Sequence, residues 1–181
     1  MKYSTKNIFC RKCNLYAKVA NPMLIGRGNK NASVLLVGEA PGRNEDEQGQ
    51  VFIGRSGQFL QYVLNNVGLD CYITNSVLCR PTDKAGNNAT PKSTNIECCL
   101  PFTIDLILEM KPKVIVALGA VAMQQLLGFS IGMEIARGKE YYHNILNATI
   151  IPTFFVTHSL LLSLSLSSSL LTKKPLSFNI P

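Results

Sequence analysis

Short apolar runs alternate along this chain with segments whose apolar residues recur every three to four positions. The runs are five to eight residues long and rich in Val, Ile and Leu, which favours buried β-strands. The predicted strands are Ser33–Val37, Cys71–Val77, Val114–Leu118 and Ala148–Phe155. The segments between them have a helical period, and the predicted helices are Gly57–Val67, Asn95–Met110 and Ala120–Leu127.

Strands that alternate with helices pair in parallel through right-handed crossovers, so helices cover both faces of one sheet. We therefore expect an α/β fold with three layers, α/β/α, around a central, mainly parallel four-stranded sheet. Residues 1–158 are expected to form this domain. Residues 159–181 differ, because the stretch from Ser159 to Leu171 is almost entirely Leu and Ser, and we expect them to be an atypical tail.

The 181 residues suit one domain, and their net charge of +7 favours an anionic partner such as nucleic acid. A merely basic surface is the alternative. No apolar run approaches the ~20 residues that span a bilayer, so no membrane partner is expected. The Met1-Lys2-Tyr3 start lacks the apolar core of a secretory signal. We expect an intracellular, cytoplasmic protein associated with the nucleoid, and a monomer.

A glycine-punctuated loop follows the first predicted strand. It begins at Gly38-Glu39-Ala40-Pro41-Gly42 and continues through Glu45-Asp46 to Val51-Phe52-Ile53-Gly54-Arg55-Ser56-Gly57. The loop places carboxylates, an aromatic ring and backbone amides at the carboxyl edge of the sheet, where open α/β sheets bind ligands. Part of it, Gly49 to Ser56, differs by one residue from a phosphate-binding P-loop, with Arg55 in place of lysine. A nucleotide-dependent phosphotransfer enzyme is therefore a second, weaker hypothesis.

Six cysteines in a reducing compartment are more typical of metal ligands, reactive thiols or buried residues than of disulfides. Cys10 and Cys13 form a C-x-x-C pair, and Cys79 and Cys99 stand near the ends of elements that can return to it. Four thiolates suit either tetrahedral zinc or a [4Fe–4S] cluster, and the spacing does not separate the two. Cys71 and Cys98 are interpreted as buried apolar residues.

An ordered set of motifs between residues 10 and about 158 resembles the family 4, iron–sulfur uracil-DNA glycosylases. The set comprises Cys10-x-x-Cys13, Gly38–Gly42 with Glu45-Asp46, Phe52-x-Gly54-Arg55-Ser56-Gly57, Tyr72 to Pro81, Cys99-Leu100-Pro101-Phe102, Lys111 to Gly119 and Arg137-Gly138. Each motif alone is weak, but their order is highly specific. The resemblance implies a [4Fe–4S] cluster on Cys10, Cys13, Cys79 and Cys99, with zinc as the lesser possibility.

The resemblance also implies DNA repair, in which uracil is flipped out of uracil-containing DNA and its N-glycosidic bond is hydrolysed to leave an abasic site. Phe52 would stack on the base, and the Asn75 amide would pair with its edge. Gly38, Glu39, Ala40 and His158 complete the expected uracil-binding set. The expected catalytic residues are Glu39, Glu45 and His158, and the expected DNA contacts are Arg55 and Ser56.

The chain departs from the family pattern near its end. The family carries His-Pro-Ser followed by an arginine, whereas here the sequence is Thr157-His158-Ser159-Leu160, and the closing helix is absent. The alternative function is therefore a catalytically impaired DNA-binding protein of the same fold that holds a metal or cluster.

Overall fold

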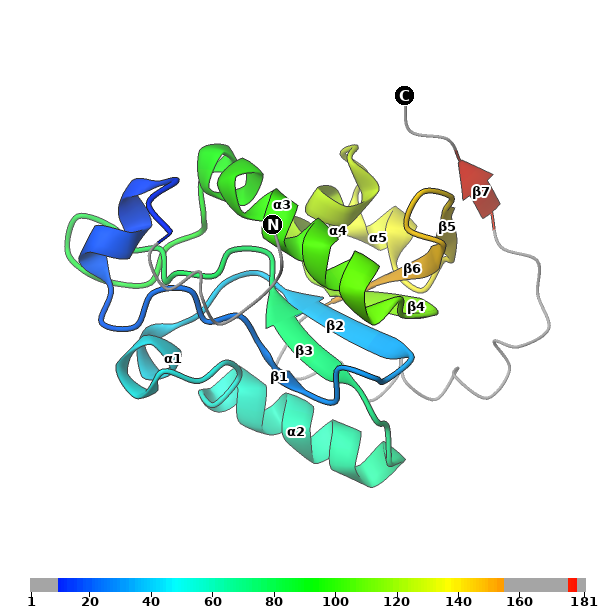
Figure 1. The fold of residues 1–181 in the computed structure, drawn as a ribbon, viewed down its shortest axis with the longest axis horizontal. Coiled ribbons are helices and arrows are strands. Elements are labelled where there is room, and N and C mark those ends of the chain that lie inside the picture. The colour runs from blue at the N-terminus through cyan, green and yellow to red at the C-terminus, as the bar shows by residue number, and fades with distance from the viewer. Residues whose placement is uncertain (1–9, 155–175, 179–181) are drawn as a thin grey trace.

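The computed structural model describes residues 10–154 and 176–178 of the chain, and a single β-sheet forms the centre of that part (Figure 1). The described strands lie in the order β1-β3-β2-β4-β6-β5-β7. Their bounds are β1 (Arg27–Gly28), β2 (Val34–Gly38), β3 (Tyr72–Asn75), β4 (Val114–Leu118), β5 (Tyr141–His143), β6 (Ala148–Thr153) and β7 (Leu176–Phe178).

The four predicted strands form the middle of this sheet, and they pair with one another in parallel, as predicted. The sheet is wider than the four strands expected from the sequence. β1 adds to β3 and β5 adds to β6, both antiparallel, and β7 adds to β5 in parallel. These extra strands have two or three residues each, too few for a period of two to be recognised.

Helices cover both faces of the sheet, which confirms the three-layer α/β/α fold (Figure 1). The bounds are η2 (Asn14–Lys18, a 3₁₀ helix), α1 (Arg43–Gln48), α2 (Arg55–Val67), α3 (Ser93–Met110), α4 (Ala120–Leu127) and α5 (Met133–Ala136). α2 lies on one face, and α3 and α4 lie on the other. The helix α1 was not predicted, because Arg43–Gln48 is polar throughout and has no apolar period.

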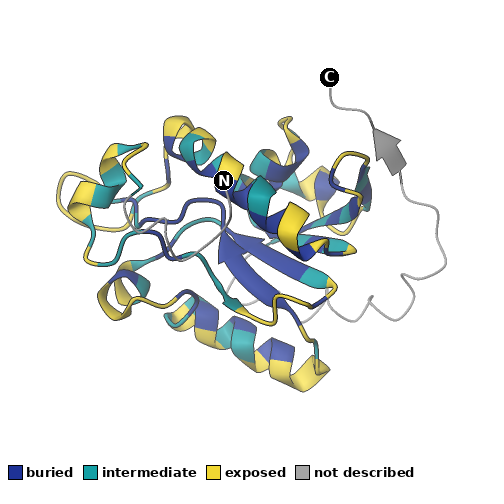
Figure 2. Cartoon of the chain, viewed as in Figure 1, coloured by how far each residue is buried: buried dark blue, intermediate teal, exposed yellow. Residues whose placement is uncertain are grey.

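Two apolar cores separate the layers, and β2 contributes to both. Leu35 and Val37 belong to the core that includes α3 and α4, whereas Leu36 belongs to the core beneath α2. Successive residues of a strand point to opposite faces, so a run of apolar residues without polar interruption is what a strand covered on both faces requires. Figure 2 shows these central strands as buried.

The structure describes only part of the expected tail, residues 159–181. Leu176–Phe178 forms β7, with Leu176 opposite Tyr141 of β5, so this part of the tail extends the sheet. Residues 155–175 and 179–181, with His158 among them, lie outside the described residues. None of the helices in the described part of the chain is long and apolar enough to cross a membrane.

The carboxyl ends of β2 and β3 meet at one edge of the sheet, where Gly38 is paired with Asn75. Two further backbone hydrogen bonds continue this alignment past the strands, from Ser76 N–H to the Gly38 carbonyl (2.8 Å) and from Val77 N–H to the Glu39 carbonyl (3.0 Å). The loop after β2 and the end of β3 therefore have a fixed relative position at the edge where ligands bind in such folds.

Candidate active site

A cavity of about 340 Å³ opens at this edge. Its walls come from the loop after β2, from α1, from the turn before α2, from the end of β3 and from the loop that follows β3. Most of the residues predicted for the site line it: Glu39, Ala40, Glu45, Phe52, Arg55, Ser56 and Asn75. Segments up to 49 residues apart in sequence, from Glu39 to Asn88, thus contribute to one pocket.

Gly38 lies next to both the Phe52 ring and the Asn75 amide. A Cβ atom at Gly38 would lie 2.6 Å from Cζ of Phe52 and 2.7 Å from Oδ1 of Asn75. Both distances are far shorter than an ordinary van der Waals contact, so only glycine fits without displacing one of these groups. Phe52 and Asn75 are themselves 7% and 3% exposed. Close packing at Gly38 therefore holds the ring and the amide near each other.

The turn at Phe52 has an unusual backbone conformation. Its φ is +56°, in the left-handed region that costs a non-glycine residue roughly 1–2 kcal/mol. The first turn of α2 packs directly against it, because a Cβ on Gly57 would lie 2.1 Å from the Phe52 carbonyl carbon. The Phe52 ring is thus oriented by its own backbone and by the start of α2.

Glu45 joins two loops of the pocket through its carboxylate. Oε2 accepts the N–H of Gly42 at 3.1 Å, and Oε1 accepts the N–H groups of Ile53 at 3.0 Å and Gly54 at 2.7 Å. The first bond caps α1, and the other two fix the turn that follows Phe52. A carboxylate that accepts several backbone N–H groups is a strong, charge-assisted anchor.

Glu39 is half-buried and lines the same cavity. Burial raises the pKa of its carboxyl group above the usual range for glutamate, because desolvation disfavours the charged form. A carboxylate with this environment is suited to stabilising a cationic group or to orienting water.

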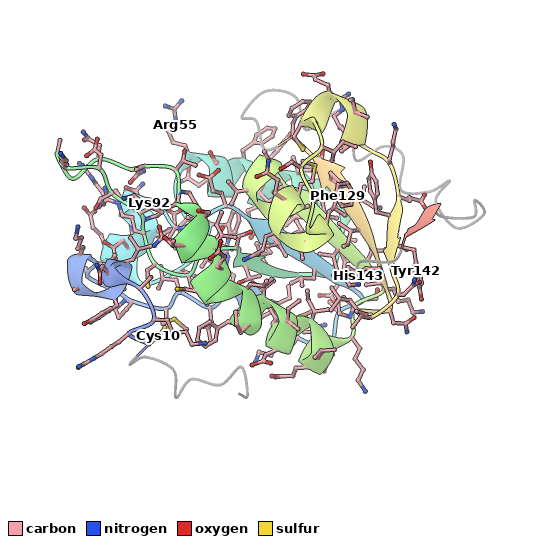
Figure 3. The ribbon with its side chains drawn as sticks, turned by 90° about the horizontal axis from the view of Figure 1, so that it is seen from above. Cys10, Arg55, Lys92, Phe129, Tyr142 and His143 are labelled. Carbon is pink, nitrogen blue, oxygen red and sulfur yellow. The ribbon has the colours of Figure 1, made fainter. Side chains whose placement is uncertain are left out.

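Arg55 and Ser56 form the first turn of α2, at the rim of the cavity. Figure 3 shows the Arg55 side chain extending outward from the molecule. The N-terminus of a helix attracts anions through its unpaired N–H groups and its dipole, and an arginine adds a formal positive charge. The rim is therefore suited to a phosphate group.

Asn88 also lines the cavity, and the sequence analysis did not identify it. It belongs to the loop after β3, where Arg80 Nε donates to Asn88 Oδ1 at 2.7 Å and Arg80 Nη2 donates to the Gly86 carbonyl at 2.9 Å. The amide nitrogen of Asn88 lies near Gly42, since a Cβ there would be 3.3 Å from it. The sequence signal was only a loop rich in Asn, Gly and Thr.

Cys79 and Cys99 are buried, and Cys10 packs against the core that contains Cys99. Burial is the main cause that raises the pKa of Cys79 to about 11 and that of Cys99 to about 12, and the nearby thiols of Cys13 and Cys10 contribute to both increases. The thiols of Cys10 and Cys13 thus lie close enough to Cys79 and Cys99 to influence their ionisation, but within the described residues no three Cys, His, Asp or Glu side chains form a group that could hold one metal ion. Backbone N–H groups already point at two sulfurs: Met23 N–H donates to Cys79 (3.4 Å), and a hydrogen bond from Leu78 lowers the pKa of Cys99.

The remaining cysteines differ from each other. Cys71 is buried in the core beneath α2, as predicted. Cys98 is only half-buried, and its thiol donates to the Lys12 carbonyl at 3.2 Å, so the prediction that it is a buried apolar residue was wrong.

Comparison with known proteins agrees with this architecture. The family model of the uracil DNA glycosylase superfamily matches residues 25–175. A type-4 uracil-DNA glycosylase from Saccharolobus solfataricus is 36% identical over 155 residues, which cover 80% of this chain and 69% of that protein. The chain belongs to the type-4 uracil-DNA glycosylase family.

Other members of the family are similar over shorter regions. The type-4 uracil-DNA glycosylase of Pyrobaculum aerophilum is 43% identical over 123 residues, or 65% of this chain, and that of Archaeoglobus fulgidus is 41% identical over 118 residues, or 64% of it. The chain spans 59% and 57%, respectively, of the length of these two relatives. The family membership predicted from the ordered motifs is confirmed.

The P-loop hypothesis is not supported by the arrangement of the loop. A P-loop directs its backbone amides at phosphate oxygens. Here the amides of Ile53 and Gly54 donate to the Glu45 carboxylate instead, and the helix α1 separates this turn from β2. Arg55 and Ser56 line the cavity at the edge of the sheet instead.

The raised pKa of Glu39 leads to a prediction about stability. Because the folded state disfavours the charged carboxylate, ionisation of Glu39 lowers stability as the pH rises through its raised pKa. Below the ordinary glutamate pKa of about 4.3 the group is neutral in both states, and no cost remains. We expect Glu39→Gln to be more stable than the wild type in urea unfolding at pH 7, with the difference disappearing near pH 4.

Glu97→Gln, which changes an exposed glutamate of α3, is the control and is expected to show no comparable stabilisation at pH 7. A stability difference for Glu39→Gln that is the same at both pH values would contradict the assignment.

The Glu45 anchor gives a second prediction. In Glu45→Gln one carboxylate oxygen becomes an NH₂ group, which cannot accept the N–H of Gly42 or of Ile53 and Gly54. We expect a loss of about 1–3 kcal/mol in the free energy of unfolding, as for a donor left unsatisfied. Glu47→Gln in the same helix alters an exposed side chain and should change stability by less than about 0.5 kcal/mol. Equal effects of the two substitutions would show that the anchor contributes nothing.

Proposed function

We propose that this protein removes uracil from DNA by hydrolysing the N-glycosidic bond, which leaves an abasic site. The observation that carries this proposal is the placement of the Phe52 ring and the Asn75 amide in one cavity, both in close contact with Gly38. The relatives of this chain carry the name of the same activity. When a base leaves the DNA stack and enters this cavity, Phe52 can stack on its face while Asn75 forms hydrogen bonds with its edge.

Recognition of the base depends on Asn75. Its amide has a carbonyl acceptor and an NH₂ donor, which complement the N3–H and the O4 of uracil. Within residues 10–154 the Asn75 side chain forms no hydrogen bond with another protein group, so its capacity remains for a ligand. Asn88 supplies a second amide at the cavity, held at its oxygen by Arg80.

The chemistry separates charge across the glycosidic bond. The sugar becomes oxocarbenium-like as uracil departs with the bonding electron pair, and water then adds to C1′ and loses a proton. The Glu39 carboxylate would stabilise the cationic sugar or orient this water. Donors at the pocket, Asn75 among them, would stabilise the negative charge on uracil. His158, which the family resemblance implies for that role, lies outside the described residues.

Glu45 has a different role from the catalytic one expected from the sequence. Its two oxygens accept three backbone N–H groups, so the carboxylate is engaged with the protein and not directed at the reacting atoms. We assign it as a positioning residue that holds the Phe52 turn against α1. Among the amides of Gly38–Gly42 expected to bind uracil, that of Gly42 is likewise occupied by Glu45.

Binding of the DNA backbone is favoured by basic groups around the site. Arg55 extends from the rim of the pocket (Figure 3). A second cavity, of about 780 Å³, is lined by four lysines that surround the loop after β3: Lys12, Lys18, Lys84 and Lys92. Together with the net charge of +7, this distribution suits a polyanion.

For the cofactor, we propose a [4Fe–4S] cluster held by Cys10, Cys13, Cys79 and Cys99. Their mutual proximity and the N–H groups directed at the sulfurs fit thiolate ligation. Within the described residues, no three Cys, His, Asp or Glu side chains converge as one metal ion would require. A cluster, in which each thiolate binds a different iron, suits more widely spaced ligands than tetrahedral zinc does. The cluster would stabilise the fold around the loop from Cys79 to Cys99.

The first test is excision of uracil from a synthetic duplex and a single-stranded oligonucleotide that each carry one uracil. We expect abasic sites with the wild type and a rate about 10²–10³-fold lower with Asn75→Ala, because a preorganised partner of the developing charge is lost. Asn66→Ala, on the surface of α2, is the control and should excise at the wild-type rate. Binding of uracil-containing DNA without any abasic product would instead favour the catalytically impaired alternative.

The cluster is tested by anaerobic purification followed by iron, sulfide and zinc analysis. We expect a brown protein that contains iron and sulfide. Cys79→Ser should lower both the iron content and the folded yield, since ligand binding and folding are coupled. Cys98→Ser, next to the ligand Cys99, should keep the wild-type iron content. Stoichiometric zinc in a colourless wild-type protein would contradict the proposal.

A further inference from the structure

We propose that Arg27 is a positioning residue for uracil recognition, acting through the backbone of Phe52; the inference rests on the proposed function. Arg27 is one of the two residues of the edge strand β1. Its Nη2 donates to the Phe52 carbonyl at 3.0 Å and to Oε1 of Gln61 at 3.1 Å. The guanidinium therefore joins the strand, the aromatic turn and α2.

The Phe52 turn needs such a restraint. Its left-handed backbone is not an intrinsic preference of phenylalanine, so contacts with the surroundings must maintain it. Two of these contacts lie just after Phe52, where the Glu45 carboxylate accepts the N–H groups of Ile53 and Gly54. The bond from Arg27 restrains the carbonyl of Phe52 itself. The peptide after the ring is thus held by a cation at one end and a carboxylate at the other.

The local sequence explains how Arg27 reaches this position. Gly26 and Gly28 flank it with φ of +132° and +111°. A Cβ on Gly26 would lie 2.5 Å from the Ile73 carbonyl oxygen, and one on Gly28 would lie 2.3 Å from that of Cys71. Both glycines are needed for β1 to lie this close to β3, opposite Ile73. The Gly-Arg-Gly segment therefore contains a short strand that places the Arg27 side chain next to the Phe52 turn.

The partners of Arg27 indicate restraint rather than charge pairing. Both acceptors are neutral, one a peptide carbonyl and the other an amide. Gln61 is itself fixed, because its Nε2 donates to Oδ1 of Asn65 at 2.8 Å. The Arg27 Nε is buried and has no hydrogen-bond partner among the described residues. A cation held among neutral groups in this way aligns the turn, and a single nitrogen, Nη2, makes both hydrogen bonds.

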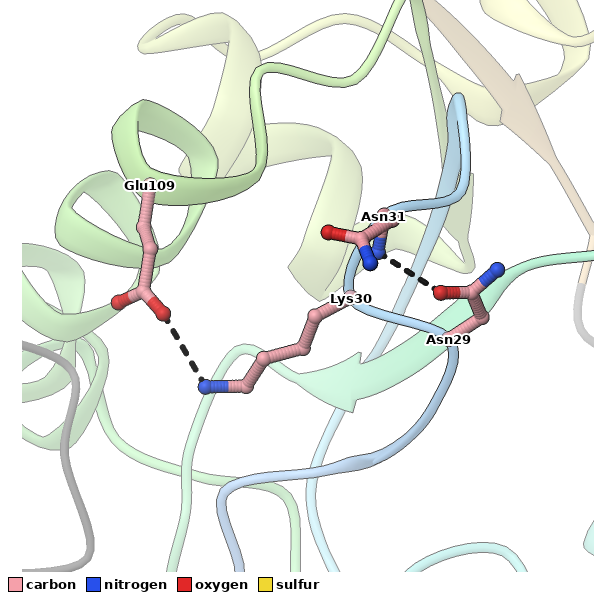
Figure 4. Close-up of polar contacts among 4 residues, drawn as sticks. All are labelled: Asn29, Lys30, Asn31 and Glu109. Atoms are coloured by element: carbon pink, nitrogen blue, oxygen red, sulfur yellow. Dashed lines mark hydrogen bonds and ion pairs between the residues drawn. The ribbon is translucent and has the colours of Figure 1, made fainter.

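The neighbouring Lys30 provides a matched control of charge. It stands three residues after Arg27, in the turn where Asn31 N–H donates to Oδ1 of Asn29, and its Nζ forms an exposed ion pair with Glu109 at 3.2 Å (Figure 4). Replacement of Lys30 removes the same formal charge from the same segment without altering the Phe52 turn. Any general effect of charge on DNA binding is therefore measured separately.

The experiment compares wild type, Arg27→Met, Arg27→Lys and Lys30→Met in two assays. Single-turnover excision of uracil at saturating enzyme reports the chemistry. Amide hydrogen exchange of Ile53 and Gly54, without DNA, reports the turn. For Arg27→Met we expect excision about tenfold to a hundredfold slower, as for the loss of a charged hydrogen bond, and at least tenfold faster exchange at both amides. Arg27→Lys should be intermediate in both assays, and Lys30→Met should stay within about twofold of wild type.

The outcomes separate this inference from the proposed function. Wild-type rates and wild-type exchange in Arg27→Met overturn the role of Arg27 and leave the glycosylase proposal intact. A wild type that does not excise uracil overturns the proposed function, and the exchange data still decide whether Arg27 restrains the turn. If Arg27→Met does not fold, Arg27→Lys carries the test, and wild-type behaviour of that variant in both assays overturns the inference.

Discussion

The convergence of three backbone N–H groups on the carboxylate of Glu45 is the interaction on which the candidate site depends. These groups come from two segments, Gly42 at the start of α1 and Ile53-Gly54 before α2. Without a common acceptor, the two segments would be independent loops over the sheet edge. With it, they form one wall, and the Phe52 ring has a defined position relative to Asn75 at the end of β3.

Close approach of backbone is the second constraint, and glycines make it possible. Gly38 lets both the ring and the amide approach its backbone closely, and Gly57 lets α2 begin against the Phe52 carbonyl. At both positions the nearest group is part of the pocket itself. The shape of the cavity is therefore determined as much by absent side chains as by those present, and the loop needs its glycines for geometry more than for flexibility.

The sequence predicted the features that depend on a strong local pattern. Val114–Leu118 and Ala120–Leu127 have the predicted bounds, because their apolar periods are clear. The pocket residues Phe52 and Asn75 were found through ordered motifs that resemble the family. Arg27 and Asn88 were not predicted, since each acts through a contact with a distant segment and belongs to no period or motif. The catalytic role expected of Glu45 stays a prediction, and its contacts with three backbone amides could not be predicted, because a sequence does not reveal which oxygen atoms such amides occupy.

The loop between Cys79 and Cys99 connects the predicted cluster ligands with the wall of the candidate active site. It starts at a buried thiol, continues immediately to Arg80, and through that guanidinium holds Asn88 at the wall of the pocket. The distance along the chain from sulfur to pocket wall is nine residues, with a direct side-chain link across it. A displacement of the chain at Cys79 would therefore move Arg80 and, through its hydrogen bond, the Asn88 wall of the cavity.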